Sequence, residues 1–228
     1  MKLLLFDIDH TLLQPSKGHR AAFEWAIYEV YGEVATLDSI ECSGMTDRQI
    51  IVELMRLHKL YERAIQSRLD QCIRVMEKRY AETLKADELV IMPGAHELLG
   101  VLSQQPGVLL GVVTGNLEGI AWGKLRKTDL ARYFRFGGFG NEDVVRSRLV
   151  EHAIQKAVRQ QGFVVANNVY VIGDTPRDVV AGHEARAITI GVATGIYSKA
   201  DLKRAGADWV IESLEEKEKI FDILDLKL

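Results

Sequence analysis

The apolar residues of the second half of the chain, and of its first few positions, fall into short unbroken runs. Four runs rich in Val, Ile and Leu show no regular alternation with polar residues, and each is followed or closed by Gly, Thr, Asp or Asn. Such runs are typical of strands that are buried on both faces of a parallel sheet. They are KLLLF (2–6), VLLGVVTGN (108–116), NVYVIGDT (168–175) and AITIGVATG (187–195), with FRFGGFG (134–140) and ADWVI (207–211) as weaker candidates.

Helical patterns separate these runs. The spacing of apolar residues predicts helices over 94–104, 117–127, 146–161 and 176–185. Strand and helix therefore alternate from about residue 90 to the end of the chain. This order predicts an α/β fold with a doubly wound, Rossmann-like parallel sheet.

The segment from residue 15 to residue 90 has a different pattern. It has no strand signal, and its apolar residues recur at intervals of three and four, which predicts amphipathic helices over 18–32, 46–60 and 61–84. We therefore expect an all-helical cap domain, residues 15–90, inserted into a Rossmann-like core of residues 1–14 and 91–228. Hinges are expected at 15–18 and 86–93.

Composition narrows the class of protein. The chain has 228 residues, 47% of them hydrophobic, and 29 basic against 32 acidic residues give a net charge of -3. This balance argues against a nucleic-acid-binding protein, which would have a basic excess. The two cysteines form no CxxC pair, which favours a reducing cytoplasm. No apolar run approaches the ~20 residues of a membrane span, so we expect no membrane partner.

Polar residues gather where the predicted strands end. Asp7 and Asp9 follow the first strand, Thr114 ends the second, and Asp174 follows another. Carboxyl ends of parallel strands meet at one edge of a sheet, and Asp178 stands one helical turn beyond Asp174. Carboxylates this close repel each other unless a cation compensates, and Mg²⁺ prefers oxygen ligands and phosphate. The pattern therefore predicts a Mg²⁺ site for a small phosphorylated substrate.

The motifs DIDHT (7–11), VVTGN (112–116) and VIGDTPRDV (171–179) resemble those of the haloacid dehalogenase superfamily of phosphohydrolases. The resemblance implies that Asp7 is a nucleophile that forms an aspartyl-phosphate and that Asp9 is the general acid and base. It implies that Asp174 binds Mg²⁺ together with Asp7 and the backbone carbonyl of Asp9, and that Asp178 is either a further metal ligand or a residue that supports the ligands.

The resemblance also implies a phosphate-binding role for Thr114, Gly115 and Asn116. Members of the family commonly carry a lysine between the second and last motifs, and the corresponding stretch GNEDVVRSRLVEHAIQKA (140–157) lacks it at the usual place. We expect Arg146 to supply the positive charge, because the predicted helix begins there; Arg148 is the alternative.

Two further positions bear on the substrate. The stretch CSGMTDRQI (42–50) resembles the substrate-facing turn of caps in this family, so Thr46 and Arg48 are candidate substrate-binding residues. His10 stands where glycine is common in the family. It is either a tolerated variant near the hinge or a contact to the substrate or leaving group.

Taken with the resemblance, the residues predict a magnesium-dependent phosphatase of a small phosphorylated metabolite, similar to phosphoglycolate phosphatases, acting as a monomer or homodimer. A phosphomutase of the same superfamily would share these residues, and a non-catalytic protein with this fold is the alternative from another class. Dehalogenation is disfavoured because the family's dehalogenases lack the second aspartate. Phosphonate hydrolysis is disfavoured because it needs a Schiff-base lysine, for which only Lys59 is available in the middle of the cap.

Overall fold

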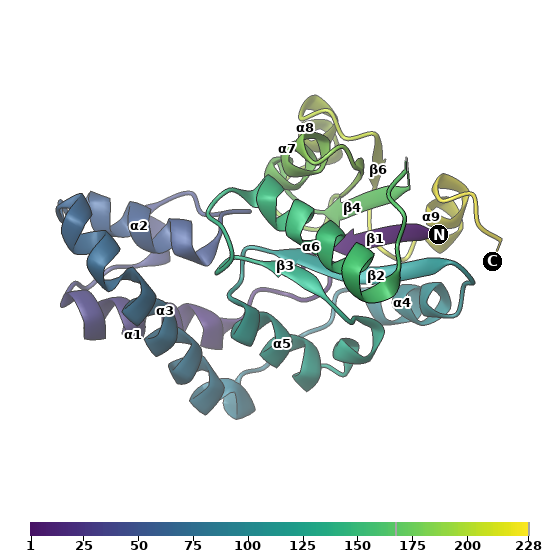
Figure 1. Cartoon of the computed structure of the whole chain (residues 1–228). Coiled ribbons are helices and arrows are strands. Elements are labelled where there is room, and N and C mark those ends of the chain that lie inside the picture. The colour runs from purple at the N-terminus through teal and green to yellow at the C-terminus, as the bar shows by residue number, and fades with distance from the viewer. Residues whose placement is uncertain (167, 228) are drawn as a thin grey trace.

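The computed structural model describes residues 1–166 and 168–227. A parallel sheet covered by helices forms one part of the molecule, and a bundle of helices beside it forms the other (Figure 1). The six described strands have the order β3-β2-β1-β4-β5-β6, which confirms the doubly wound α/β fold. They are β1 (Lys2–Phe6), β2 (Val108–Thr114), β3 (Gly137–Phe139), β4 (Val169–Gly173), β5 (Ile188–Val192) and β6 (Trp209–Ile211).

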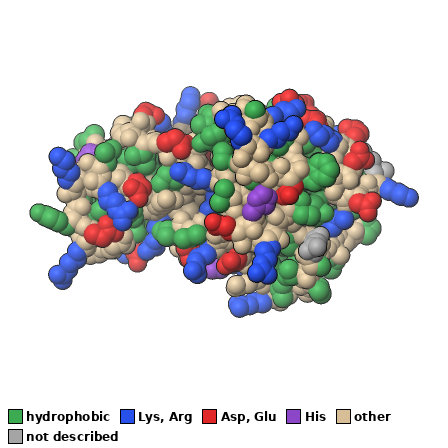
Figure 2. Space-filling view, turned by 90° about the horizontal axis from the view of Figure 1, so that it is seen from above, with side chains coloured by type: hydrophobic (Ala, Val, Ile, Leu, Met, Phe, Trp, Pro, Cys, Tyr) green, Lys and Arg blue, Asp and Glu red, His purple; other side chains and the backbone are tan. Residues whose placement is uncertain are grey.

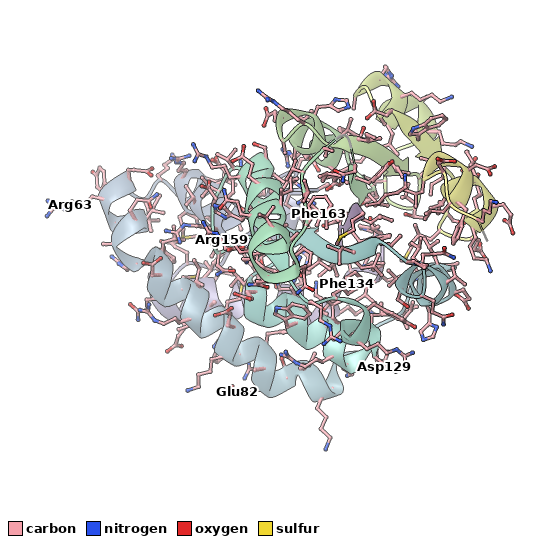
Figure 3. All side chains as sticks on the ribbon, turned by 45° about the vertical axis from the view of Figure 1, so that its right-hand side comes forward. Arg63, Glu82, Asp129, Phe134, Arg159 and Phe163 are labelled. Carbon is pink, nitrogen blue, oxygen red and sulfur yellow. The ribbon has the colours of Figure 1, made fainter. Side chains whose placement is uncertain are left out.

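Successive residues of β1 point to opposite faces of the sheet, as the pleat requires. Leu4 and Phe6 belong to a core with one set of helices, and Leu3 and Leu5 belong to a core with the other set. Phe134 and Phe163 lie on these two sides (Figure 3). The first face is covered by α4 (Ala95–Ser103), α5 (Glu118–Lys127) and α9 (Lys217–Ile223), and the second by α6 (Arg146–Gln161), α7 (Pro176–Glu184) and α8 (Lys199–Arg204).

The four expected helices and all six expected strands are present. β1 matches its apolar run, and the other five strands are shorter than the runs that predicted them. The sequence pattern did not predict α8 and α9. Both are too short to show a helical period, and α8 is instead defined by a capping box in which Ser198 and Asp201 bond to each other's backbone N–H.

The helical bundle consists of α1 (Lys17–Tyr31), α2 (Asp47–Leu57) and α3 (Glu62–Thr83), close to the three expected ranges. It has its own hydrophobic core, which extends onto Leu117 and Ile120 at the start of α5. At the two ends of α3, Arg63 and Glu82 point outward from the bundle (Figure 3). We therefore propose the division into a cap, residues 15–90, and a core, residues 1–14 and 91–228.

The two connections between cap and core run side by side. Gln14 N donates to Val90 O at 2.8 Å, and Met92 N donates to Leu12 O at 2.9 Å. Because their backbones are paired, the two connections form one narrow junction between cap and core rather than two independent linkers.

Asp87 joins the same two connections through its buried carboxylate. It accepts hydrogen bonds from Ser16 Oγ at 2.5 Å, Tyr80 OH at 3.0 Å and Gly18 N at 3.0 Å. Ser16 also caps α1, because its Oγ accepts from His19 N. The start of α1 and the end of α3 are thus held at one point.

Replacing Asp87 by Ala should destabilise the protein by about 3 kcal/mol, because buried donors lose their acceptor. The change in the free energy of unfolding is measured by urea denaturation followed by tryptophan fluorescence, from the shift of the midpoint. Asp70→Ala is the control: the Asp70 side chain is 70% exposed and pairs with Arg48 on the surface, so its loss should cost less than about 0.5 kcal/mol. Equal midpoints for the two variants would contradict the role given to Asp87.

Acidic and basic side chains are interspersed on the face shown in Figure 2, and neither sign gathers into a large patch there. Within residues 1–166 and 168–227, no helix combines the length and the hydropathy that crossing a bilayer requires.

Candidate active site

Three buried aspartates meet at the carboxyl edge of the sheet. Asp7 follows β1, Asp174 follows β4, and Asp178 lies in the first turn of α7. One carboxylate oxygen from each lies within 4.8 Å of the others, and each residue is at most 6% exposed. The parallel strands thus bring together three of the four expected metal-binding residues.

Burial and mutual repulsion make these carboxylates hard to ionise. Burial raises the pKa of Asp7 to about 7, with contributions from the charges of Asp178 and Asp9 and an opposing one from Arg146. Burial and the Asp7 and Asp178 charges raise the pKa of Asp174 to about 9. Among the described residues, the Asp174 carboxylate receives one long hydrogen bond, from Thr11 Oγ1 at 3.5 Å. The cluster has the carboxylate oxygens that bind a divalent cation, and the positive charge beside it is not sufficient to neutralise the three carboxylates.

Arg146, at the start of α6, reaches this cluster. Nη2 of its guanidinium donates to Asp7 Oδ1 at 2.9 Å and to Asp178 Oδ1 at 2.5 Å, and Nε donates to the same Asp178 oxygen at 3.0 Å. Nη1 donates to Gly44 O in the cap at 3.1 Å. Its side chain is 9% exposed. Arg148 is 62% exposed and faces Asp143 at 3.8 Å. The structure thus places Arg146, and not Arg148, at the aspartate cluster.

Asp178 has a second function in the local fold. Its Oδ2 accepts from Thr175 N at 3.0 Å and Thr175 Oγ1 at 2.6 Å, which forms a capping box with the N-terminus of α7. Both carboxylate oxygens therefore have protein partners. Asp178 is oriented firmly at the edge of the cluster.

Asp9 lies apart from the other three carboxylates. Both of its oxygens bind Lys124 Nζ, at 2.8 and 3.0 Å, and Oδ2 also accepts from Asn116 Nδ2 at 2.7 Å. Burial raises the pKa of Asp9, but the Lys124 and His19 charges and these hydrogen bonds outweigh it, so the pKa lies below its usual value. The Asp9 side chain is 27% exposed, and it borders the cavity between cap and core.

The loop after β2 meets the cap directly. Asp47 N donates to Gly115 O at 2.8 Å, and Leu117 N donates to Asp47 Oδ2 at 2.9 Å. A side chain at Gly115 would come within 2.1 Å of Met45 O, so only glycine allows this approach. The cap loop is therefore docked on the core, beside Thr114.

A cavity of about 570 Å³ lies between cap and core. The catalytic end is bordered by Asp7, Asp9, Thr114, Asn116 and Asp174. The cap end combines apolar and charged side chains, namely Phe23, Leu37, Ile40, Met45, Ile50, Lys17, His19, Arg20, Asp38 and Glu41. A cavity of this size admits a small molecule that places one end against the aspartates.

The structure does not support two of the expected substrate contacts. Thr46 is wholly buried, and its Oγ1 accepts from Gln49 N as the cap of α2. Arg48 binds Asp70 of α3 at 3.1 Å. Neither is among the described residues that line the cavity. The helix direction explains both outcomes: the loop before Thr46 faces the core, whereas Arg48 lies on the side of α2 that meets α3.

His10 borders the cavity and has a backbone φ of +60°. This left-handed conformation is the reason why glycine suits the position, and His is among the side chains that tolerate it. Its carbonyl accepts from Thr194 Oγ1 at 2.6 Å. Burial lowers the pKa of its imidazole, against the charge of Asp9.

Sequence reasoning missed Lys124, His19 and Asp47. Lys124 follows Asn116 by two helical turns within a predicted helix, so the spacing could have placed it on the side of that helix nearest the motif. His19 Nε2 lies 3.2 Å from Asp47 Oδ2, and both border the cavity. That contact joins α1 to α2, and the sequence holds no signal for it.

Comparisons of the sequence with known proteins identify a family and relatives whose members are hydrolases and phosphatases. The model of the haloacid dehalogenase-like hydrolase family matches residues 4–192. A phosphoglycolate phosphatase of Pseudomonas savastanoi pv. phaseolicola is 24% identical over 218 residues, covering 94% of this chain and 78% of its own.

Two solved structures have the same fold. A hydrolase from Pseudomonas syringae superposes with a TM-score of 0.72 at 21% identity, covering 98% of this chain and 99% of its own. CbbY from Rhodobacter sphaeroides, solved in complex with phosphate, gives a TM-score of 0.74 at 17% identity, covering 95% and 96%.

Proposed function

Because the chain belongs to the haloacid dehalogenase-like hydrolase family, we propose that it is a magnesium-dependent phosphatase that hydrolyses a small phosphorylated metabolite through an aspartyl-phosphate. The observation that carries the proposal is the cluster of Asp7, Asp174 and Asp178 with Arg146, beside a cavity of about 570 Å³. The similarity to a phosphoglycolate phosphatase supports the phosphatase class.

Asp7, Asp174 and the backbone carbonyl of Asp9 would hold Mg²⁺, with Asp178 as a further ligand or as the support of Arg146. The raised pKa values of Asp7 and Asp174 are the observation that favours a cation here, because a cation restores the ionised form of both. When bound, Mg²⁺ reduces the repulsion between the anionic nucleophile and the anionic phosphoryl group.

The reaction would proceed in two displacements. An Asp7 oxygen attacks phosphorus, and the bond from phosphorus to the leaving oxygen breaks. Asp9, which must be protonated in the substrate complex for this step although its pKa is low without substrate, gives its proton to that oxygen. Asp9 then takes a proton from water as the water oxygen attacks the same phosphorus. Phosphate leaves, Asp7 returns to its carboxylate form, and Asp9 is again protonated.

The other residues bind and orient. Thr114 is buried beside the cluster, so its hydroxyl can donate to a phosphoryl oxygen. Arg146 keeps positive charge between Asp7 and Asp178 and can donate to the same phosphoryl group. Gly115 contributes backbone, and its lack of a side chain lets the cap loop close over the site.

The substrate is proposed to be a phosphate monoester whose leaving group contacts both apolar and charged side chains of the cap. The cap end of the cavity, with Phe23 and Ile50 near Lys17 and His19, is built for such a mixture. As part of the same proposal, the enzyme acts in the cytoplasm as a monomer or homodimer. The free thiols of Cys42 and Cys72 support a reducing compartment.

The test is phosphate release from a panel of phosphorylated metabolites, measured with Mg²⁺, with EDTA, and after Mg²⁺ is restored. We expect release that EDTA abolishes and Mg²⁺ restores, with one class of monoester preferred at least tenfold. Release that is unaffected by EDTA would contradict the metal dependence. Transfer of phosphate to a sugar phosphate in place of water would indicate a phosphomutase, and metal binding without either activity would indicate a non-catalytic protein.

A further inference from the structure

Lys124 is a fully buried cation at the active site. It lies on α5, and its side chain is 0% exposed. Its ammonium donates to both oxygens of Asp9, at 2.8 and 3.0 Å, and to Asn116 Oδ1 at 2.6 Å. The contacts of Nζ are therefore made with polar groups of the active site.

The three side chains form a closed set of hydrogen bonds. Asn116 accepts from Lys124 through Oδ1 and donates to Asp9 Oδ2 through Nδ2 at 2.7 Å. The amide therefore has one orientation that satisfies both partners. The Asp9 carboxylate is held from two directions, so rotation about its terminal bond would break several hydrogen bonds together.

Stability alone does not account for this arrangement. A buried ion pair is seldom more stabilising than apolar residues of the same volume. The neighbouring buried residues of α5 are Ile120, Ala121 and Leu125, so an apolar side chain at position 124 would continue the hydrophobic core. The partner of Lys124 is also a carboxylate that borders the catalytic end of the cavity and does not join the metal cluster.

We propose that Lys124 is a positioning residue of the hydrolase, which acts with Asn116 to fix the Asp9 carboxylate at the border of the cavity. The inference rests on the proposed function, because it assumes that Asp9 exchanges protons with the leaving oxygen and with water. Lys124 lies on the protein side of Asp9 and acts through it, without touching the substrate. The side-chain amide of Asn116 acts with Lys124 on Asp9, in addition to the phosphate-binding role expected for this residue.

The experiment compares two substrates. An alkyl phosphate needs a proton on its leaving oxygen, whereas p-nitrophenyl phosphate releases a stable phenolate. Lys124→Met should lower kcat/KM for the alkyl phosphate about 100-fold and for p-nitrophenyl phosphate less than tenfold. In the Asp9→Asn background, Lys124→Met should change kcat/KM for either substrate less than twofold, because residues that act as a unit are not additive.

Two more variants keep the test independent of folding. Asn116→Ala leaves the Lys124–Asp9 ion pair in place. It should lower kcat/KM for the alkyl phosphate about tenfold and, like Lys124→Met, lower kcat/KM for p-nitrophenyl phosphate less. Lys127→Met is the matched control one turn along α5, where Lys127 Nζ binds carbonyls of Leu84, Lys85 and Asp87 near the hinge. It should affect both substrates equally.

If Lys124→Met and Asn116→Ala lowered kcat/KM equally for both substrates, the inference would be overturned. It would also be overturned if Lys124→Met lowered kcat/KM as much in the Asp9→Asn background as it does in the wild type. In both cases the wild-type protein would still release phosphate, and the proposed function would stand. A wild-type protein that releases phosphate from neither compound in Mg²⁺ would overturn the proposed function, and this inference with it.

Discussion

Asp7→Asn should lower magnesium-dependent phosphate release by at least about 10⁴-fold, which is the scale of loss when a nucleophile is removed. The amide oxygen of Asn is a poor nucleophile, and the neighbouring Asp178 is not free to replace Asp7. Asp174 and Asp178 lie within 4.8 Å, but Asp178 is already bonded through both oxygens to Thr175 and Arg146. The measurement is phosphate release under saturating Mg²⁺ with the preferred substrate of the panel.

The same variant should remain folded. Asp7 is crowded by the Asp178 and Asp9 charges, so a neutral side chain of equal size removes repulsion while Arg146 keeps its bonds to Asp178. We expect a melting temperature no more than a few degrees below that of the wild type. An active Asp7→Asn variant would refute the aspartyl-phosphate mechanism, and an unfolded one would refute the electrostatic account of the cluster.

The sequence contained most of the information on the core. Strands buried on both faces are continuous apolar runs, and the carboxyl ends of parallel strands converge, so Asp7, Asp174 and Asp178 could be placed together from the order of elements alone. The helical period likewise predicted α6 to begin at Arg146. These features follow from local patterns and from topology, both of which can be read along one chain.

The cap is where sequence reasoning was weakest. Thr46 and Arg48 were chosen because the loop before α2 resembles a substrate-facing turn, but a one-residue step along a helix changes the side chain's direction by about 100°. Asp47, between them, is the residue that contacts the core, at Gly115 and Leu117. Which face of a cap helix meets the core depends on docking between two bodies, and no periodicity within one helix encodes it.

Buried ion pairs between residues that lie far apart in the sequence are equally hard to predict. Lys124 lies within the predicted helix 117–127, whereas its partner Asp9 lies 115 positions earlier. The pattern of α5 does not distinguish a solvent-facing lysine from one that points at the sheet edge. Only the packing of α5 against the loop after β1 decides between them.

Arg146→Met should lower kcat/KM by about 10³-fold, because removal of a charge-assisted donor from a site that excludes water is costly in the transition state. Asp7 and Asp178 would also lose the cation between them. Arg146→Lys should recover part of this loss and remain about tenfold to 100-fold below wild type. A single ammonium can replace the bonds that Nη2 makes to Asp7 at 2.9 Å and to Asp178, but it cannot also bond Gly44 O, as Nη1 of the guanidinium does.

The matched controls are two other arginines. Arg148→Met changes a side chain that is 62% exposed and lies two positions along α6, so it should change kcat/KM less than twofold. Arg177→Lys leaves the aspartates and Arg146 unchanged and weakens the contacts of Arg177 with the cap loop, to Ser43 O at 2.8 Å and to Glu41 at 3.9 Å. If Arg177→Lys were as damaging as Arg146→Lys, cap docking would explain the loss. A defect confined to the Arg146 variants would show instead that the guanidinium acts at the aspartates, in the place that the family's lysine takes.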